Sequence, residues 1–344
     1  MHTEFSTANS PPGSTVSPSF AALADNIAHR ALRGTHPTKE ELVALFAVSP
    51  HSPEAAWLGH TARKMASHVA GNVGRVWSAI GVDCRPCSMN CQFCSFGEQW
   101  GIITTPYEWS SERIVSTARR FVAQGARWVT LRTTEFYSLD SLLALVRQLR
   151  HDVPGTYDVV VNTGEFGPEE TAAMKAAGVT TVYHSLRLGE GTTTCFRVEE
   201  RLATLAAVRD SELDLAHLVE PVGPEHSNEE LADVLLTALR HAAALCGVMA
   251  RVNVRGTPCG DAAQQELDPL RLAQIAAVTR LAGGSQTPDI CVHPPTPQAL
   301  AWGANVLVVE TGAIPRAKQE SNEEWRAFTV EDAQTMLQQA GYAV

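Results

Sequence analysis

Strand-like and helix-like segments alternate along most of this 344-residue chain, and no other feature of the sequence restricts its fold so strongly. Eight short runs rich in β-branched residues are strand-like, at residues 76–82, 128–131, 158–162, 181–186, 214–218, 249–254, 290–293 and 306–310. Amphipathic runs lie between them, at residues 111–124, 139–152, 168–177, 198–210, 228–246, 269–282 and 297–302. Parallel strands need crossover helices, so the alternation predicts an α/β fold closed as a (β/α)8 TIM-type barrel.

An open doubly wound sheet is the alternative arrangement of the same elements. That fold carries a glycine-rich phosphate fingerprint, G-x-G-x-x-G, after its first strand. The fingerprint is absent at that place in this sequence, which favours the barrel.

Helical patterns precede the first strand. Residues 20–33 are rich in alanine and leucine, and residues 52–73 continue the helical lead-in. Between them, Thr38 is predicted as an N-cap, because Glu41 follows at the spacing of a capping box. The first 19 residues are rich in Ser, Thr and Pro, which is typical of disorder. We therefore expect a disordered tail, a helical N-terminal extension and a barrel with a C-terminal helix, over residues 1–19, 20–74 and 75–344.

The charge of the chain limits its partners. There are 27 Lys and Arg residues against 37 Asp and Glu residues, which gives a formal net charge of −10. An acidic chain is poorly suited to a phosphate backbone, so we expect no nucleic-acid partner. No apolar stretch approaches the roughly 18 residues of a membrane span, and the polar N-terminus lacks the apolar core of a secretory signal. We therefore expect a cytoplasmic protein without a membrane partner.

Half of the eight cysteines lie in one short segment, residues 84–94. The last three of them, Cys87, Cys91 and Cys94, have the spacing C-x3-C-x2-C. Thiolates this close repel one another unless a metal or cluster gathers them, and soft sulfur ligands suit iron–sulfur clusters. Three ligands for the four irons of a 4Fe–4S cluster leave one iron open to a substrate.

Three other interpretations of these cysteines compete. A structural zinc site would pair Cys84 with Cys87 and Cys91 with Cys94, but zinc ribbons place about 15–20 residues between two such pairs. A closed ferredoxin-type cluster would use all four thiols, although the bacterial ferredoxin spacing runs in a different order. A disulfide fits poorly in a chain without a secretory signal.

The segment resembles the signature of radical S-adenosylmethionine (SAM) enzymes, in which an aromatic residue, here Phe93, precedes the last cysteine. The resemblance implies that Cys87, Cys91 and Cys94 hold a 4Fe–4S cluster whose open iron binds the amino and carboxylate groups of SAM. It also implies that Phe93 lies near the adenine. One electron from a flavodoxin- or ferredoxin-type reductant would then cleave SAM to methionine and a 5′-deoxyadenosyl radical, which abstracts hydrogen from a small-molecule substrate.

Later segments resemble the biotin synthase-like branch of these enzymes, which includes biotin synthase, an FeFe-hydrogenase maturase, methylornithine synthase and the archaeal-type lipoyl synthases. The matching segments are residues 201–210, 251–258 and 293–305, and the resemblance covers about residues 45–344. It implies a full barrel with a helical N-terminal lead-in, the fold that the alternating segments also predict.

Functional residues of a parallel barrel sit at the C-terminal ends of its strands. After the second strand, Thr134 and Glu135 occupy the place of the family's Gly-Gly-Glu-like motif, which holds the SAM ammonium. By the same resemblance, Glu190 accepts hydrogen bonds from the SAM ribose and Arg187 binds a carboxylate of SAM or substrate. Arg201 matches the arginine that pairs with the SAM carboxylate. Ordinary solvated side chains are the alternative for Glu135 and Arg201.

Other polar residues at strand ends are candidates for binding a substrate or moving a proton. They are Asn162, Glu165, Glu220, His226, Asn253, Arg255, His293 and Glu310. A structural hydrogen-bonding role is the alternative for each of them.

The remaining cysteines are scattered, at Cys195, Cys246, Cys259 and Cys291. Biotin synthase holds a second, sulfur-donating cluster with cysteines on its second, third and fifth strands, and the corresponding strand-like runs here have none. We therefore expect a single cluster. A second cluster at Cys195, Cys259 or Cys291 is the alternative.

The sequence thus predicts a radical SAM enzyme of cofactor or specialised-metabolite biosynthesis. Sulfur insertion, rearrangement, fragmentation and methyl transfer stay open as its reaction. A non-enzymatic iron–sulfur electron carrier or cluster scaffold is the alternative function.

Overall fold

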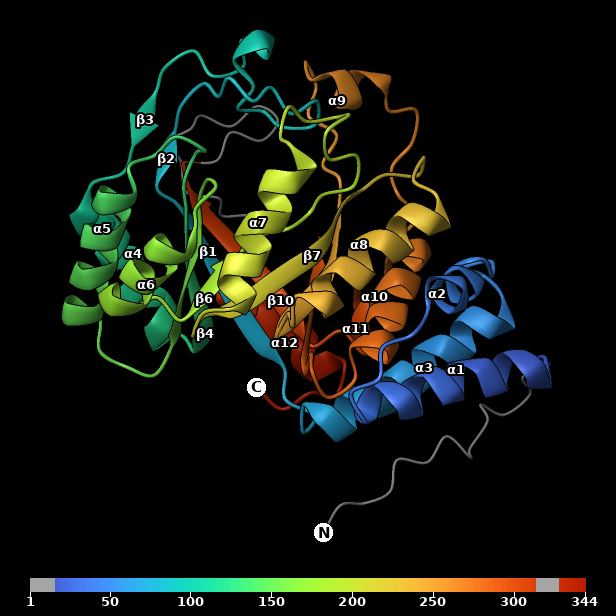
Figure 1. Cartoon of the computed structure of the whole chain (residues 1–344). Helices are drawn as coiled ribbons and strands as arrows, with labels where there is room; N and C mark the ends of the chain where they lie inside the picture. The colour runs from blue at the N-terminus through green and yellow to red at the C-terminus, as the bar shows by residue number, and fades with distance from the viewer. Residues whose placement is uncertain (1–15, 314–327) are drawn as a thin grey trace.

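Eight parallel strands close into a barrel at the centre of the molecule (Figure 1). The computed structural model describes residues 16–313 and 328–344. The barrel strands are β1 (Arg75–Gly81), β4 (Ala126–Arg132), β5 (Asp158–Asn162), β6 (Thr181–Tyr183), β7 (Asp214–Val222), β8 (Leu245–Ala250), β9 (Asp289–His293) and β10 (Val306–Gly312). Each strand pairs with the next one along the chain, and β10 closes the barrel against β1. The predicted (β/α)8 barrel is therefore confirmed.

Helices between the strands, together with α12 after the last strand, cover the outside of the barrel (Figure 1). They are α4 (Ser111–Ala123), α5 (Leu139–Asp152), α6 (Pro168–Ala177), α7 (Val198–Arg209), α8 (Asn228–Arg240), α10 (Pro269–Gly283), α11 (Pro297–Ala301) and α12 (Val330–Gln339). Serine caps begin several of them, since the side chains of Ser110, Ser138 and Ser227 accept hydrogen bonds from first-turn N–H groups. None of the described helices is long and apolar enough to cross a membrane.

Three helices precede the barrel: α1 (Pro18–Leu32), α2 (Lys39–Phe46) and α3 (Pro53–Val69). Thr38 caps α2, and its capping box with Glu41 is present as predicted. All three pack against α10, and α3 also packs against α11. Gly59 of α3 lies so close to Trp302 that an added Cβ would sit 2.2 Å from the indole. Residues 1–15 of the predicted tail lie outside the described residues. α1 begins at Pro18, so the last two residues of the predicted tail, 18 and 19, are helical.

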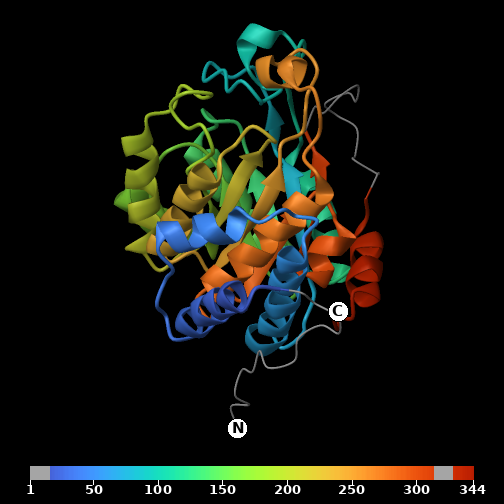
Figure 2. The ribbon, with the colours of Figure 1, turned by 90° about the vertical axis from the view of Figure 1, so that its right-hand side faces the viewer.

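The two ends of the barrel differ (Figure 2). The short elements η1 (Glu98–Trp100) and α9 (Pro258–Ala262) lie at one end, and α1 and α3 lie toward the other. The small sheet of β2 (Asp83–Cys84) and β3 (Tyr107–Glu108) also follows the C-terminal end of β1. Inside the barrel, large side chains pack together, among them Trp77, Trp128, Val160 and Leu245. Side chains therefore fill much of the barrel interior, and the room for a site lies toward the C-terminal ends of the strands and the loops after them.

Several predicted elements are wrong at their boundaries. α8 ends at Arg240 and β8 begins at Leu245, whereas the predicted helix extended to residue 246 and the predicted strand covered 249–254. Ala242 takes a left-handed conformation, with φ 55°, which is incompatible with a continuing helix. The apolar run that follows is a strand whose first four residues are buried, and such runs lack the alternation that distinguishes a strand from a helix. β6 also ends at Tyr183, before the predicted end at residue 186.

Candidate active site

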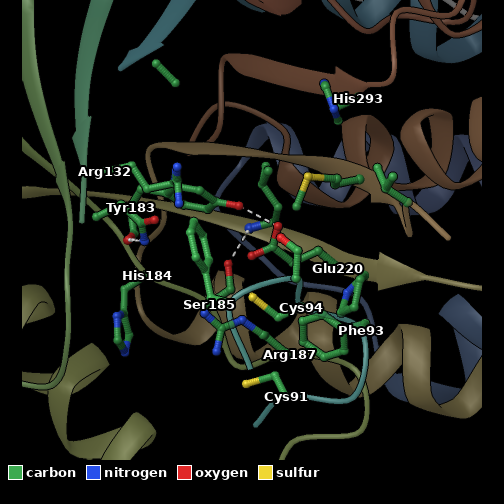
Figure 3. Close-up of a pocket in the computed structure, with 18 of the residues that line it drawn as sticks. Cys91, Phe93, Cys94, Arg132, Tyr183, His184, Ser185, Arg187, Glu220 and His293 are labelled. Carbon is green, nitrogen blue, oxygen red and sulfur yellow. Dashed lines mark hydrogen bonds between the residues drawn. The ribbon is translucent and has the colours of Figure 1, made fainter. Parts of the chain in front are cut away.

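A cavity of about 280 Å³ opens at the C-terminal ends of the barrel strands. One wall is the loop that carries the clustered cysteines, and the other walls are strand ends and the loops that follow them. Figure 3 shows Cys91, Cys94 and Phe93 on one side of this cavity, His293 on the opposite side, and Glu220 between them.

The cysteine loop is tied to the rest of the barrel by backbone hydrogen bonds. Within the loop, Cys87 N donates to Phe96 O over 2.7 Å. Gln92 N donates over 2.8 Å to Thr193 O in the loop after β6, and Gln92 O accepts over 2.9 Å from Cys259 N in α9. The cysteines are therefore held against two other loops of the cavity mouth.

Cys87, Cys91 and Cys94 all line the cavity, whereas Cys84 is fully buried and packs against Phe96. Burial raises the pKa of Cys87 and raises that of Cys91 to about 12, and neighbouring thiols act in the same direction. Thiols in such a place ionise only when a bound metal compensates their charge. Among residues 16–313 and 328–344, no three Cys, His, Asp or Glu side chains converge as ligands of a single metal ion. A 4Fe–4S cluster binds each of its thiolates on a different iron, and the three cysteines of this loop supply three such ligands at one cavity.

Asp83 fixes the backbone beside Glu135. The buried Asp83 carboxylate accepts hydrogen bonds from Thr134 N, over 2.7 Å, and from the Thr134 hydroxyl. Glu135 follows at the cavity wall, where burial raises the pKa of its carboxyl group although Arg201 and Arg187 act in the opposite direction. A bound ammonium group would offset the cost of burying this carboxylate.

Behind the cavity wall, Arg201 holds a buried network of charges. Its Nη1 lies 2.6 Å from Glu165 Oε1, and its Nε lies 3.3 Å from Glu190 Oε2. His184 Nε2 lies 3.2 Å from Glu165 Oε2. Burial opposes ionisation of Glu165, but the hydrogen bond with His184 and the charge of Arg201 outweigh it and hold the pKa at about 2. Glu165 therefore stays ionised as part of the wall.

Arg187 is the cation of this group that reaches the cavity. It lines the cavity, its Nη1 lies 3.9 Å from Glu190 Oε2, and the described residues offer that nitrogen no hydrogen-bond partner. Phe196 packs against both arginines, with its ring centroid 3.8 Å from the guanidinium carbon of Arg201 and 5.5 Å from that of Arg187. Direct contact between Arg201 and a ligand stays a prediction, because Arg201 lies behind this surface.

The half of the cavity away from the cysteines is aromatic and polar. The Tyr183 hydroxyl donates to Glu220 Oε2, and Trp77 Nε1 donates to Thr130 Oγ1 over 2.5 Å. The rings of Trp77 and Tyr183 meet edge to face, with centroids 5.3 Å apart. Burial raises the pKa of Glu220, although Arg187 and the hydrogen bond from Tyr183 lower it.

Four of the substrate candidates meet at this cavity. Asn162, Glu220, His293 and Glu310 all line it. His293 Nε2 lies 3.9 Å from Glu310 Oε2, and Asn162 Nδ2 donates to the backbone oxygen of Tyr183 over 2.9 Å. The candidates therefore occupy one surface built from four different strands.

The other substrate candidates lie elsewhere. Glu165 is in the wall, and His226 lines a separate pocket of about 190 Å³. Asn253 and Arg255 were expected to point toward the barrel mouth because alternate residues of a strand face the same way. Both residues follow the end of β8, so this expectation does not apply to them. Asn253 Oδ1 instead accepts a hydrogen bond from Arg251 Nε over 3.2 Å.

The cavity also contains residues that the sequence reasoning missed, namely Trp77, Arg132, Tyr183 and Arg251. Trp77 and Tyr183 lie within predicted strands. Alternate residues of a strand point to the same face, so following the inward-facing positions of each predicted strand could have found them. Arg251 directly follows β8. The predicted strand covered residues 249–254, so Arg251 was not recognised as a residue at the end of a strand.

The remaining cysteines are dispersed. Cys195 is exposed, and Cys259 lies in α9. Cys246 on β8 packs in the core between barrel and helices, whereas Cys291 on β9 packs inside the barrel. β4, β5 and β7 contain no cysteine.

Comparisons with known proteins agree on one family. The model described as the radical SAM superfamily matches residues 84–238. The biotin synthase of Rippkaea orientalis is 27% identical over 282 residues, which cover 76% of this chain and 73% of that protein. The biotin synthase of Synechocystis sp. is 29% identical over 192 residues, which cover 51% of this chain and 52% of that protein.

Solved structures share the fold. Methylornithine synthase aligns with a TM-score of 0.74 at 16% identity, covering 92% of this chain and 96% of that one. HydG, a maturase of the FeFe-hydrogenase, aligns with a TM-score of 0.73 at 14% identity, covering 95% of this chain and 76% of that one. At these identities the likeness concerns the fold alone.

Proposed function

Because this chain belongs to the radical SAM superfamily, whose enzymes use a 4Fe–4S cluster and SAM, we propose that its barrel cavity binds both cofactors and acts on a small-molecule substrate. One observation carries the proposal. Three cysteine side chains line the same cavity as Glu135 and Arg187, an acid and a base that match the ammonium and carboxylate of an amino acid such as the methionine part of SAM.

We assign Cys87, Cys91 and Cys94 as the cluster ligands. When bound, cluster and SAM supply the one-electron cleavage of SAM that generates a 5′-deoxyadenosyl radical. Phe93 lines the cavity beside the cysteines and offers its ring to the adenine. Cys84 takes no part, because its side chain is buried away from the cavity.

Two charged groups hold the methionine part of SAM in this proposal. Glu135 accepts the ammonium, and the hydrogen bonds of Asp83 to Thr134 fix the backbone from which Glu135 projects. Arg187 binds the carboxylate, with Arg201 behind it as the counter-charge of the wall.

Glu190 supports this arrangement from within the loop. Its carboxylate accepts from Arg187 N over 3.1 Å and from the Thr194 hydroxyl over 2.5 Å. These bonds favour a role in shaping the loop over the role at the ribose that the family resemblance implies.

The substrate lies in the half of the cavity lined by Asn162, Glu220, His293 and Glu310. The barrel encloses this half, which keeps a reactive radical next to one C–H bond and away from water. A flavodoxin- or ferredoxin-type protein in the cytoplasm would supply the electron.

The proposed reaction differs from that of the biotin synthases. Their second cluster needs cysteines on the strands that correspond to β4, β5 and β7, and these strands contain none here. We therefore propose a single cluster. Rearrangement, fragmentation or methyl transfer then fit better than sulfur insertion from a protein-held cluster.

Electron paramagnetic resonance of the anaerobically reconstituted and reduced protein tests whether SAM binds at the cluster. The proposal expects about one 4Fe–4S cluster per chain, whose signal changes when SAM is added because SAM reaches the open iron. A signal that does not respond to SAM would instead support a non-enzymatic electron carrier or cluster scaffold.

A further inference from the structure

Tyr183 has a central place in the cavity that the binding of cofactors does not explain. It ends β6, lines the cavity and donates its hydroxyl hydrogen to Glu220 (Figure 3). Trp77 packs edge to face against its ring, and Asn162 binds its backbone oxygen. Glu220 is itself only 5% exposed. The phenol is therefore held in one orientation beside a buried carboxyl group.

A phenol gives up a hydrogen atom more readily than most side chains. Its O–H bond is weaker than an aliphatic C–H bond, so a carbon radical that meets a tyrosine hydroxyl takes its hydrogen in a downhill step. Burial, and next the Glu220 carboxylate, raise the pKa of Tyr183 well above 10, so the hydroxyl keeps its hydrogen at neutral pH. Burial also raises the pKa of Glu220, which favours its protonated form.

We propose that Tyr183 donates a hydrogen atom to carbon radicals formed in this cavity and that Glu220 is its proton partner. The inference rests on the proposed function, because SAM cleavage is the source of the radical. It adds a catalytic residue on β6 that lies outside the cysteine loop and outside the charged groups assigned to SAM.

Hydrogen-atom donation by Tyr183 requires one further electron, which a reductant supplies. The phenolic O–H bond breaks homolytically and a C–H bond forms, which leaves a closed-shell product and a tyrosyl radical at Tyr183. A one-electron donor of the flavodoxin or ferredoxin class reduces the tyrosyl radical, and the proton returns from the Glu220 carboxyl group across their hydrogen bond. After the product has left, water reaches the cavity and restores the proton on Glu220.

Reductive cleavage of SAM in D2O, with dithionite and without substrate, tests the proposal. The Tyr183 hydroxyl exchanges with solvent, whereas carbon-bound hydrogens do not. We expect the parent protein to form 5′-deoxyadenosine that carries a deuterium and Tyr183→Phe to lose that deuterium. The readout is the deuterated fraction measured by mass spectrometry, which does not depend on how much SAM each variant cleaves.

Tyr157→Phe is the matched control. The Tyr157 ring is buried, its hydroxyl binds Leu149 O and Val153 O, and it does not line the cavity. This variant should keep the deuterated fraction of the parent. Equal deuterium in Tyr183→Phe and the parent, or none in the parent, would overturn the proposal.

A second measurement uses the parent protein, in case Tyr183→Phe does not fold. Freeze-quenched samples should show an organic radical whose resonance narrows when the protein is made with ring-deuterated tyrosine. A line shape that ring deuteration leaves unchanged would overturn the tyrosyl assignment. Complete absence of 5′-deoxyadenosine would instead contradict the proposed function, and this inference would fall with it.

Discussion

Two arginines are almost completely buried at opposite ends of the barrel, and their surroundings differ. Arg280, near the end of α10, is 0% exposed. It donates from Nε to Gly303 O over 3.0 Å and from Nη1 to Pro288 O over 2.7 Å. Its Nη2 donates to Asn305 Oδ1 over 2.6 Å. Every nitrogen of this guanidinium therefore binds a fixed, uncharged acceptor.

Arg201, at the start of α7, is 1% exposed but faces carboxylates. Glu165 and Glu190 are its charged neighbours, and its Nη2 has no hydrogen-bond partner in the described part of the chain. Arg187, one loop away, lines the cavity directly.

The difference separates a structural cation from a functional one. The nitrogens of Arg280 bind fixed acceptors in the segments around residues 287–288 and 303–305, so this arginine joins α10 to the loops at the closed end of the barrel. The cations at the mouth keep unused donors, and the carboxylates of Glu165 and Glu190 hold them beside the cavity. Burial alone therefore does not identify a functional arginine, whereas the kind of acceptor around it does.

The cysteines of the mouth should give the largest effect. Alanine at Cys87, Cys91 or Cys94 should abolish cluster iron and SAM cleavage, because the cluster has no other protein ligands to spare. Cys84→Ala should keep both, since Cys84 lies outside the cavity. Iron and sulfide analysis after anaerobic reconstitution measures the effect. Loss of the cluster in Cys84→Ala but not in Cys87→Ala would reverse the assignment.

The same analysis tests the single cluster. The triple variant with alanine at Cys87, Cys91 and Cys94 should contain almost no iron. Iron that stays bound would reveal a second cluster and would restore sulfur insertion as the first candidate reaction.

At the closed end, Arg280→Met should lower the free energy of unfolding by roughly 3–5 kcal/mol, because it leaves several buried acceptors without a donor. Urea denaturation of the apoprotein measures the change. Arg240→Met, at an exposed position at the end of α8, is the control and should stay within about 0.5 kcal/mol of the parent. If Arg280→Met lowers the free energy of unfolding by no more than Arg240→Met does, the structural role assigned to Arg280 is wrong.

At the mouth, Glu135→Gln and Arg201→Met should each weaken SAM binding by roughly 1.5–3 kcal/mol. The first change removes the charge that faces the SAM ammonium, and the second leaves Glu165 and Glu190 without their counter-charge behind Arg187. Calorimetric titration of the reconstituted variants measures the affinity. Folded Arg280→Met should bind SAM as the parent does. If both mouth variants also bind SAM with the affinity of the parent, the assignment of these residues is wrong.

The smallest effect concerns Glu165, whose pKa lies at about 2 in the folded protein against 4.5 for a free side chain. A lowered pKa means that ionised Glu165 stabilises the fold above about pH 4.5 and that this contribution disappears as the pH falls toward 2. At pH 7 the apoprotein should exceed Glu165→Gln by about 2 kcal/mol in free energy of unfolding, which is less than the full pKa difference corresponds to because solvent reaches part of the Glu165 side chain. Denaturation at several pH values checks the trend, and a difference that grows as the pH falls would contradict it.

The barrel was predictable because each parallel strand needs its own return helix, and that alternation is visible in the sequence. The prediction failed at β8, where the buried run 245–250 is apolar on both faces. The cysteine wall of the cavity was also predictable, since its three thiols are neighbours on one loop.

The charged wall could not be predicted in the same way. Glu165, His184 and Arg201 come from segments after β5, after β6 and in α7, and only closure of the barrel brings them together. Arg280 was equally hidden, because α10 is enclosed by the barrel on one side and by α1 and α3 on the other. A helix that is covered on both sides shows little amphipathic pattern from which to infer its surroundings.

Formation of 5′-deoxyadenosine is the most direct test of the mouth as a radical SAM site. Anaerobically reconstituted protein, SAM and dithionite are combined, and the product is quantified by mass spectrometry. The parent and Cys84→Ala should form 5′-deoxyadenosine, and Cys94→Ala should form none. A parent protein that holds a complete 4Fe–4S cluster and binds SAM but forms no 5′-deoxyadenosine would contradict the proposed function.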